Sequence, residues 1–460
     1  MKPMPLDQIA KWAEGTLDGG RGDRCVMRVC SDSRKVQPGD LFVALEGDRF
    51  DGHKFLDDIL EKGAVAALVR RQEKSKGGKL SLIKVEDTLK GLQVLASNYR
   101  KSLEVKVVGI TGSNGKTSAK EFIAQVLGKK FKATKTQGNL NNHIGLPLTL
   151  LSMKESDKMA VIEIGMNHRG EIAHLAKLAK PDYAVVTSVG WAHIEFFKDR
   201  DEIAQEKGDL VREVSREGVC ILNGDDERVR KMSDWTASHC VSVGSTFGLD
   251  YYYDSVNWDG AYTNFTLHTS DQDLALKIGY PGWHMVQNAS LAGALGIELG
   301  VRPIDLKAGL METAIPGGRL LVERLNDGWL LDDSYNANPD SMIAAFRTLN
   351  MMSGGGRRVA ILGSMGELGE RSRELHQAVG KVAEQEGVGL LLAVGEYACD
   401  FMKGATEEGL NLSRAIVCTN HHDLVQAYMQ EQRSDDVVLV KGSRLSSMEK
   451  VSELLREEVV

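Results

Sequence analysis

The stretch VKVVGITGSNGKTSAKEF, residues 105–122, decides how the chain around it folds. A short apolar strand (105–110) runs into a glycine-rich turn, and a segment with helical spacing follows. The backbone N–H groups of such a turn, together with a helix N-terminus, can bind phosphate. The residues predicted to bind a nucleotide here are Gly112, Ser113, Asn114, Gly115, Lys116, Thr117 and Ser118.

This loop is a variant of the common phosphate-loop pattern G-x-x-x-x-G-K-[ST]. The first glycine of that pattern would fall on Ile110, whereas the chain has glycines at 109 and 112. The succession of strand, turn and helix still favours a nucleotide site over an accidental glycine-rich turn. In such a site Lys116 reaches the β- and γ-phosphates, and the Thr117 hydroxyl binds Mg²⁺.

Strands and helices alternate on both sides of the loop. Apolar runs at 159–165, 183–188 and 219–222 are separated by helical patterns, which predicts a parallel sheet covered on both faces. A helical pattern at 284–300 is predicted to end this central unit. The alternation restarts after residue 320, with a hairpin turn at 326–328 and strands at 358–363, 389–395 and 436–442.

We therefore predict an α/β fold with three domains. The first covers residues 1–103, the second is a central parallel-sheet P-loop domain at 104–318, and the third is a Rossmann-like domain at 319–460. The length of 460 residues agrees, because domains average roughly 150 residues.

The composition argues against several classes of protein. Hydrophobic residues make up 42% and charged residues 26%, as in ordinary globular proteins. The net charge is −7, and the densest basic run (70–79) is typical of a solvated loop, so we expect no nucleic-acid partner. The sequence contains neither a membrane-spanning apolar stretch nor a signal-peptide pattern, which predicts a cytoplasmic protein, and we expect a monomer. The six scattered cysteines are expected to be mostly buried, reduced thiols.

Polar residues follow several of the predicted strands. Glu163 ends the strand at 159–165, where a carboxylate faces the usual ligand crevice and could bind Mg²⁺; the alternative is a solvated strand end. His193 follows the strand at 183–188 and is either a metal ligand or a structural histidine. Asn139, Asn141 and Asn142 recognise a polar substrate or belong to a capped loop.

The segment TGSNGKT (111–117) resembles the ATP loop of the Mur ligases and folylpolyglutamate synthases. Members of that group activate a carboxylate as an acyl-phosphate and let an amine displace the phosphate. The resemblance implies ATP and Mg²⁺ as cofactors, and it assigns Lys116 to catalysis and Glu163 and His193 to metal binding beside Thr117.

Other segments extend the resemblance to the Mur ligase family over nearly the whole chain. GWHMVQN (282–288) implies that Asn288 contacts the adenine, against the alternative of a polar helix N-terminus. Arg319, in GGRL, would approach the γ-phosphate unless it is a surface charge. The segment at 31–55 is similar to the family's uridine-nucleotide segment, which assigns Ser33 and Arg34 to that ligand and the first domain to the UDP-linked substrate.

LDDSYNANPDSM (331–342) is the most specific segment, and a capped strand-to-helix loop does not explain the whole string. It resembles family members that add D-alanyl-D-alanine to UDP-N-acetylmuramoyl-tripeptide. The resemblance implies that Asp333 binds the ATP ribose, that Asn336 and Asn338 face the substrate, and that the third domain receives the dipeptide. LGSMGELG (362–369) departs from the family's usual L-G-D-M at Ser364, so the role of that side chain stays open.

Lys207 lies fourteen residues after His193 in a helical pattern that, by itself, favours an exposed lysine. Several Mur ligases carry a carbamoylated lysine at the matching place, so the resemblance implies a catalytic Lys207. Three rivals stay open: a folylpolyglutamate-type ligase, another Mur ligase, and an ATP-regulated binding protein without ligation. The sequence also leaves open whether the third residue of the tripeptide is diaminopimelate or lysine.

Overall fold

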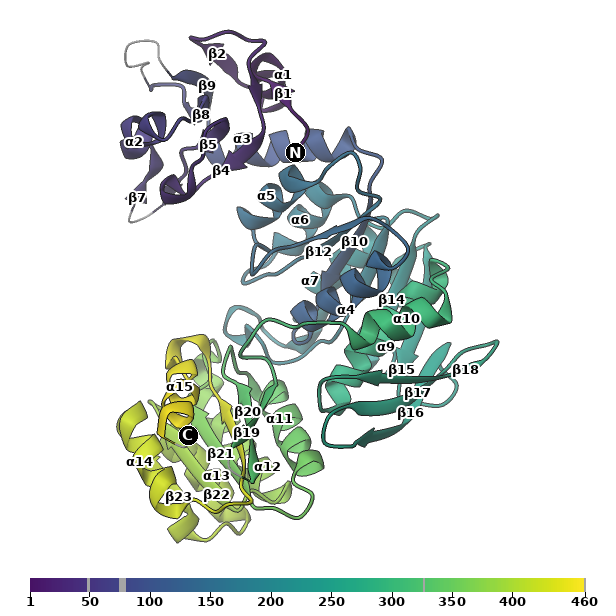
Figure 1. Cartoon of the computed structure of the whole chain (residues 1–460), viewed down its shortest axis with the longest axis vertical. Helices are drawn as coiled ribbons and strands as arrows, with labels where there is room; N and C mark the ends of the chain where they lie inside the picture. The colour runs from purple at the N-terminus through teal and green to yellow at the C-terminus, as the bar shows by residue number, and fades with distance from the viewer. Residues whose placement is uncertain (48–49, 74–79, 326, 459–460) are drawn as a thin grey trace.

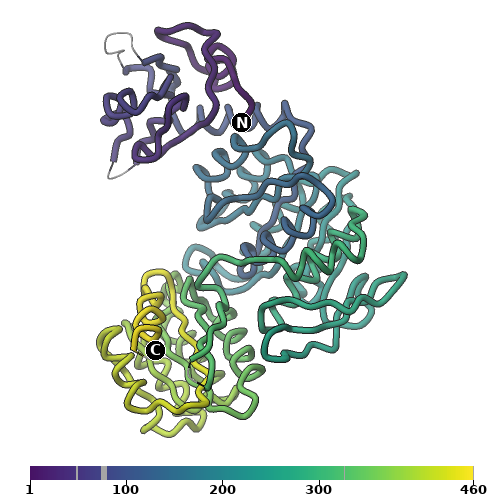
Figure 2. The backbone as a smooth tube through the Cα atoms, in the orientation of Figure 1, coloured from purple at the N-terminus to yellow at the C-terminus, as the bar shows by residue number. Residues whose placement is uncertain are grey.

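The computed structural model describes residues 1–47, 50–73, 80–325 and 327–458. Three successive units form an open C, with the central unit as its spine (Figure 1). The backbone passes through the units in order, from the N-terminal to the C-terminal end of the C (Figure 2). Two predictions fall partly outside the described residues, namely the hairpin turn at 326–328, through residue 326, and the basic run at 70–79, through residues 74–79.

The N-terminal unit contains a five-stranded sheet in the order β2-β9-β8-β5-β4, in which only the β2–β9 pair is antiparallel. The long helix α3 packs on α1 and also on α5 and α6 of the next unit. The elements are β1 Met4–Pro5, α1 Leu6–Trp12, β2 Thr16–Asp18, β3 Cys25–Val26, β4 Arg28–Cys30, η1 Ser33–Lys35, β5 Asp40–Val43, β6 Glu46–Gly47, β7 Phe50–Asp51, η2 Gly52–Phe55, α2 Leu56–Glu61, β8 Ala66–Arg70, β9 Ser81–Val85 and α3 Thr88–Lys101.

The central unit is a nine-stranded sheet in the order β11-β12-β10-β13-β14-β15-β16-β17-β18. Helices α4, α9 and α10 pack together on one face, and α5, α6 and α7 pack on the other. The elements are β10 Lys106–Thr111, α4 Lys116–Gly128, β11 Ala133–Lys135, α5 Gly145–Ser152, β12 Met159–Glu163, α6 Glu171–Ala179, β13 Tyr183–Val186, η3 Ile194–Phe196, α7 Arg200–Arg212, β14 Val219–Asn223, α8 Glu227–Arg230, η4 Lys231–Trp235, β15 His239–Gly244, β16 Tyr251–Trp258, β17 Thr263–His268, β18 Asp273–Ile278, α9 Trp283–Glu298 and α10 Pro303–Met311.

The C-terminal unit is a six-stranded sheet in the order β19-β20-β24-β21-β22-β23, parallel except for the β19–β20 hairpin. The elements are β19 Leu321–Leu325, β20 Gly328–Asp333, α11 Pro339–Met352, β21 Arg358–Gly363, η5 Gly369–Arg371, α12 Ser372–Gln385, β22 Leu390–Val394, α13 Ala398–Glu408, η6 Leu412–Arg414, β23 Ala415–Cys418, α14 His421–Glu431, β24 Val437–Lys441, η7 Arg444–Ser446 and α15 Glu449–Glu458.

Strand β10 is the structural centre of the phosphate-loop region. Val107, Val108 and Ile110 are fully buried, because β10 lies between β12 and β13 with helices on both faces. Gly109 allows helix α7 to approach closely, since a β-carbon there would lie 2.7 Å from the Leu210 side chain. The phosphate loop therefore leaves the sheet from a rigid, close-packed strand.

The predicted α/β fold is confirmed, and the parallel sheet covered on both faces holds for β11 to β16. Beyond β16, strands β17 and β18 form an antiparallel extension that was not predicted. The prediction that the helix at 284–300 ends the central unit is wrong, because α10 follows it and packs on α4.

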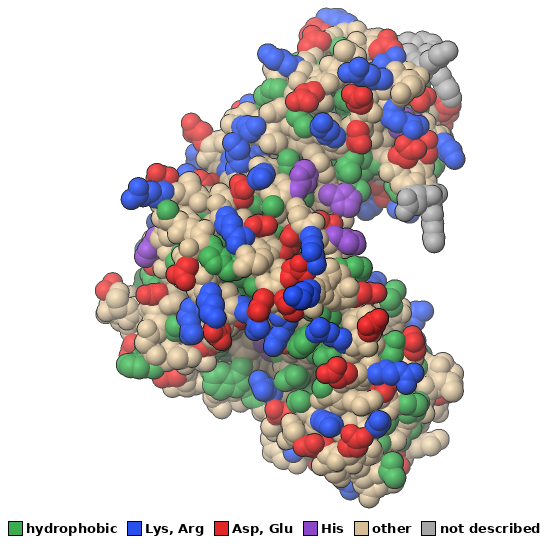
Figure 3. Space-filling view, turned by 180° about the vertical axis from the view of Figure 1, so that it is seen from behind, with side chains coloured by type: hydrophobic (Ala, Val, Ile, Leu, Met, Phe, Trp, Pro, Cys, Tyr) green, Lys and Arg blue, Asp and Glu red, His purple; other side chains and the backbone are tan. Residues whose placement is uncertain are grey.

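The surface carries charges of both signs (Figure 3), and the cysteines are all free. Basic and acidic side chains are interspersed over the face seen from behind (Figure 3). In the described part of the chain, no helix is long and apolar enough to cross a membrane. All six cysteines are free, but only Cys30, Cys220 and Cys418 are buried, so the prediction of mostly buried thiols is wrong.

Candidate active site

The phosphate loop has the backbone that its glycines make possible. Gly112 has φ +153°, and a β-carbon there would lie 1.9 Å from Thr187 Oγ1; Gly115 precedes α4 with φ +82°. Lys116 Nζ donates to the Gly112 carbonyl at 2.7 Å. Burial lowers the pKa of Lys116, so an anion such as a phosphate would stabilise its charged form.

Glu163 lies directly beneath this loop at the end of β12. Its Oε2 accepts a hydrogen bond from the Thr117 hydroxyl at 3.0 Å, and its Oε1 accepts one from Asn141 Nδ2 at 2.7 Å. Lys120 Nζ lies 3.7 Å from Oε2 and 3.1 Å from Glu121 Oε1. Glu163 is almost completely buried, so the solvated-strand-end alternative is wrong.

The oxygens of Thr117 and Glu163 suit Mg²⁺, which typically takes one or two carboxylates and completes its shell with water and substrate phosphates. Within the described residues, no group of three or more His, Cys, Asp or Glu side chains could enclose a metal on its own. The donor set therefore fits a cation that arrives with nucleotide phosphates rather than a closed structural metal site.

A cavity of about 670 Å³ opens above Glu163 and joins the central unit to the C-terminal unit. It brings together most of the residues predicted from the sequence. Those that line it are Ser113, Asn114, Gly115, Lys116, Thr117, Ser118, Asn139, Asn141, Asn142, Glu163, His193, Asn288, Arg319, Asp333, Asn336 and Asn338.

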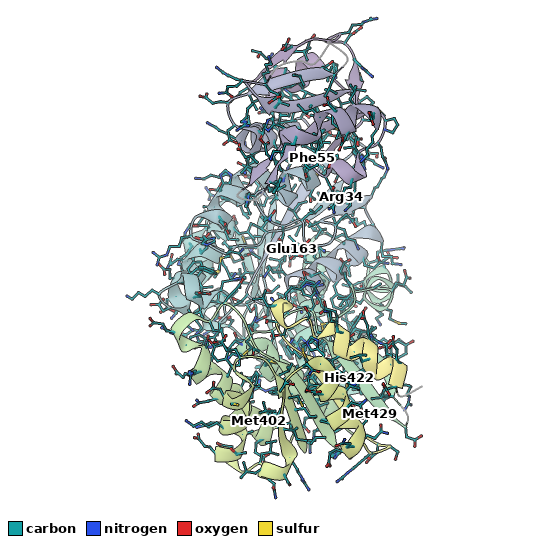
Figure 4. The ribbon with its side chains drawn as sticks, turned by 90° about the vertical axis from the view of Figure 1, so that its left-hand side faces the viewer. Arg34, Phe55, Glu163, Met402, His422 and Met429 are labelled. Atoms are coloured by element: carbon teal, nitrogen blue, oxygen red, sulfur yellow. The ribbon has the colours of Figure 1, made fainter. Side chains whose placement is uncertain are left out.

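Four predicted residues lie outside this lining, namely Gly112, Lys207, Ser33 and Arg34. Ser33 and Arg34 belong to η1 of the N-terminal unit, where the exposed Arg34 side chain pairs with Asp32 at 2.9 Å. Figure 4 shows Arg34 on the N-terminal unit, apart from Glu163 in the central unit.

His193 faces the C-terminal unit. Its Nδ1 lies 2.6 Å from Glu367 Oε2, and the proximity of His193 lowers the pKa of Glu367. His193 and Glu367 both have positive φ, +64° and +59°, which is uncommon for residues with a β-carbon and recurs at functional sites. Glu367 also lines the cavity, and the sequence analysis did not single it out.

The C-terminal wall of the cavity carries paired charges. Asp333 Oδ2 pairs with Lys441 Nζ, and Asp333 Oδ1 accepts a hydrogen bond from the Leu320 N–H at 3.2 Å. Burial raises the pKa of Asp333, and Lys441 opposes that effect. The Arg319 guanidinium lies 3.6 Å from the centre of the Tyr335 ring. Lys441 was missed, although a lysine at the carboxyl end of a buried strand was a signal in the sequence.

Two of the predicted asparagines have identifiable structural contacts. Asn142 Oδ1 accepts from the N–H groups of Ile144 and Gly145 at the start of α5, which matches the capped-loop alternative. Asn288 packs on the phosphate loop, since a β-carbon at Gly115 would lie 2.5 Å from its Oδ1.

Ser364, which departs from the family's usual L-G-D-M pattern, has a local structural role. Its Oγ accepts a hydrogen bond from the Tyr397 N–H at 3.1 Å.

Lys207 is buried, and the exposed-lysine interpretation that the helical pattern favoured is wrong. It lies on α7, whose neighbouring Glu206 accepts the N–H groups of Gly170 and Ile172 at 2.8 Å at the start of α6. Burial, reinforced by the charge of Lys116, lowers the pKa of Lys207 well below its usual value.

Family models match three parts of the chain. The Mur ligase middle domain matches residues 110–296, the glutamate ligase domain of Mur ligases matches 318–444, and the catalytic domain of the Mur ligase family matches 26–100. A UDP-N-acetylmuramoyl-tripeptide–D-alanyl-D-alanine ligase of Bacillus subtilis is 35% identical over 448 residues, which covers 97% of each chain.

Solved structures agree over the whole length. The crystal structure of MurF from Acinetobacter baumannii superposes with a TM-score of 0.91 at 30% identity and covers 100% of both chains. That of MurF ligase from Thermotoga maritima, in complex with ADP, has a TM-score of 0.83 at 29% identity and covers 94% of this chain and 98% of the other.

Proposed function

Because the chain belongs to the Mur ligase family, we propose that it uses ATP to join D-alanyl-D-alanine to UDP-N-acetylmuramoyl-tripeptide, a step of peptidoglycan precursor synthesis. The observation that carries the proposal is the shared cavity. The phosphate loop and Glu163 form one wall of it, and Asp333, Glu367 and Lys441 of the C-terminal unit form the other. Such an arrangement holds a nucleotide beside a second substrate.

The proposed reaction has two steps in this cavity. The terminal carboxylate of the tripeptide attacks the γ-phosphorus of ATP, which forms an acyl-phosphate and releases ADP. The amine of the dipeptide then attacks the acyl carbon, so that the C–N bond forms, the C–O bond to phosphate breaks and a proton leaves. Lys116 and the loop N–H groups stabilise the negative charge that spreads over the transferred phosphoryl group.

Mg²⁺ is part of the proposal, held by the Thr117 hydroxyl and the Glu163 carboxylate, and bound there it would neutralise phosphate charge. His193 is proposed to serve a second cation. Asn288 and Asp333 would contact the adenosine, and Arg319 the γ-phosphate. Asn139, Asn141, Asn142, Asn336 and Asn338 are proposed to contact the peptide substrates or to shape the walls that do.

The gaps between elements support the proposed domain boundaries. Helix α3 ends at Lys101 and β10 begins at Lys106, which supports a boundary near 103. Helix α10 ends at Met311 and β19 begins at Leu321, which supports one near 318. The first domain would then bind the UDP moiety near Ser33 and Arg34, and the third the dipeptide. The cavity between the second and third domains should close to keep water from the acyl-phosphate.

One coupled assay tests the function. Phosphate release is measured with ATP, Mg²⁺ and UDP-N-acetylmuramoyl-tripeptide, with and without D-alanyl-D-alanine, and the product mass is recorded. We expect release to depend on the dipeptide and the product to carry one new amide bond. Running both the diaminopimelate and the lysine tripeptide identifies the donor. Phosphate release that ignores the dipeptide, or ligation only of glutamate to a folate, would overturn the proposal.

A further inference from the structure

The loop of residues 189–193, which presents His193, is held by side chains from three different places. Three successive backbone N–H groups each donate to a different side-chain oxygen. These bonds are Val189 N to Asp226 Oδ2 at 2.7 Å, Gly190 N to Ser113 Oγ at 2.8 Å and Trp191 N to Asp340 Oδ2 at 2.7 Å. Asp226 belongs to the same unit, Ser113 to the phosphate loop and Asp340 to the C-terminal unit.

Asp340 is fixed where it meets this loop. It lies in the first turn of α11, beside a capping box in which Asn338 and Ser341 bind each other's backbone N–H groups. Gly190 packs directly against the Asp340 carboxylate, since a β-carbon at Gly190 would lie 2.2 Å from Asp340 Oδ2. The carboxylate therefore accepts the Trp191 N–H at a position that the helix determines.

The side chain of Trp191 joins the same interface. Its ring contacts the guanidinium of Arg200 at 4.8 Å, from its own unit, and that of Arg371 at 5.5 Å, from the C-terminal unit. Arg371 also donates to the Lys198 carbonyl at 3.2 Å. Two residues beyond Trp191, His193 has φ +64°, a conformation that surrounding contacts must hold in place.

We propose that Asp340 is a positioning residue for the ligation proposed above. By accepting the Trp191 N–H, it fixes the 189–193 loop, and with it the His193 side chain, only when the C-terminal unit is docked. Since Ser113 holds the neighbouring amide, the same loop also depends on the conformation of the phosphate loop. The geometry of His193 is thereby coupled to both units. A loop displaced by about 1 Å can cost on the order of 100-fold in rate, so this coupling affects turnover.

The first test compares Asp340→Ala, Asp340→Asn and the control Asp305→Ala. Asp305 also lies in the first turn of a helix, α10, but it pairs with Arg302 of its own unit at 2.6 Å, so it is an aspartate in a first helical turn away from the interface. We expect Asp340→Ala to lower kcat by about 10- to 100-fold while KM for ATP changes by less than about twofold. Asp340→Asn keeps an oxygen that can accept the Trp191 N–H and should restore most of kcat. Asp305→Ala should match the wild type.

A fluorescence measurement tests the coupling without turnover. Six tryptophans contribute to the emission, so the Trp191 signal is taken as the difference between each protein and its Trp191→Phe version. We expect acrylamide to quench this signal more strongly in Asp340→Ala than in the wild type or Asp340→Asn. If Asp340→Ala does not fold, Asp340→Glu is used in its place. The longer glutamate side chain would displace the Trp191 N–H from the position that Asp340 fixes.

The outcomes separate this inference from the proposed function. A wild type that does not ligate the dipeptide overturns the function, while the quenching comparison still decides the role of Asp340. A wild type that ligates, with Asp340→Ala equal to it in kcat and quenching, overturns the positioning role alone. The role is also overturned if Asp340→Asn is as impaired as Asp340→Ala, because the charge and not the hydrogen bond would then matter.

Discussion

Asn114 of the phosphate loop and Asn338 at the start of α11 form a reciprocal amide pair across 224 residues of sequence. Asn114 Nδ2 donates to Asn338 Oδ1 at 3.2 Å, and Asn338 Nδ2 donates to Asn114 Oδ1 at 2.7 Å. Asn338 is also the N-cap of α11, since its side chain accepts the Ser341 N–H. One side chain therefore stabilises a helix and joins the C-terminal unit to the nucleotide loop.

A double-mutant cycle on this pair should show coupling. We expect Asn114→Ala and Asn338→Ala to be non-additive in kcat/KM by about 0.5–3 kcal/mol, as for residues in direct contact. Asn338→Ala should also lower the free energy of unfolding by about 1 kcal/mol through the lost cap. The control cycle pairs Asn114→Ala with Asn420→Ala, the N-cap of α14, and should be additive. Additive effects in both cycles would contradict a functional contact.

Lys116→Ala should abolish ligation and leave the fold intact. The ammonium group that meets the transferred phosphate is lost, while the loop backbone is fixed independently by the contacts of Gly112, Ser113 and Asn114 with residues 187–188. Turnover is measured by phosphate release and folding by the thermal midpoint. The control is Lys129→Ala, just beyond the same helix, whose surface pair with Glu312 should matter to neither. Near-normal turnover in folded Lys116→Ala would remove the loop from the mechanism.

Glu163→Gln should raise the Mg²⁺ concentration needed for half-maximal turnover by at least about tenfold, the scale seen when even outer-shell partners of a metal are lost. Glutamine keeps the size of the side chain but removes the anionic oxygen beside the Thr117 hydroxyl. Turnover is titrated with MgCl₂ at fixed ATP. Glu155→Gln, at the surface pair with Lys2, serves as control. An unchanged Mg²⁺ dependence would show that Glu163 does not bind the cation.

The parts of the fold with local signals were predictable from the sequence. Strand β10, the glycines of the loop and Lys116-Thr117 are contiguous, so the pattern alone placed them. The antiparallel strands β17 and β18 were missed, although their buried and exposed residues alternate as the period of a half-buried strand requires. The sequence of these two strands therefore contained the alternation that predicts a half-buried strand, but the prediction did not use it.

Contacts between distant segments could not be predicted in this way. Asp340 meets Trp191 across 149 residues, and Glu367 meets His193 across the same interface. Neither carboxylate stands in a pattern that distinguishes it from a helix-start or loop residue. Burial of Lys207 also depended on how α7 packs on α6, which helical spacing does not reveal.

Lys207 should behave as a buried amine with a depressed pKa. Burial and the nearby Lys116 charge both disfavour its protonated form, so the pKa lies well below the usual 10.5. Between that depressed pKa and 10.5 the unfolded chain binds the extra proton. In CO₂-depleted buffer, where the amine is unmodified, the free energy of unfolding should therefore rise with pH in this window, and the contribution is lost as pH falls through the folded pKa. Lys207→Met should flatten this rise.

A neutral buried amine is a nucleophile for CO₂, and the product would be a carbamate: the N–C bond forms and a proton is released. The new anion would offset the charge of Lys116, which now disfavours a protonated Lys207. We expect wild-type turnover to fall in CO₂-depleted buffer and to recover with bicarbonate, and ¹³C-labelled bicarbonate to give a carbamate resonance. Lys207→Ala should lose on the order of 100-fold in turnover, the scale of a lost electrostatic stabiliser. A short carboxylic acid should restore part of it.

The control is Lys177→Ala, at an exposed lysine on the adjacent helix α6, which should keep wild-type turnover and respond to CO₂ depletion as the wild type does. Lys207→Arg separates charge from carbamate, because arginine stays protonated and cannot take up CO₂ in this way. If the carbamate is required, Lys207→Arg is as inactive as Lys207→Ala. If turnover needs only a cation at this position, arginine restores activity, bicarbonate has no effect on the wild type, and the carbamate hypothesis is wrong.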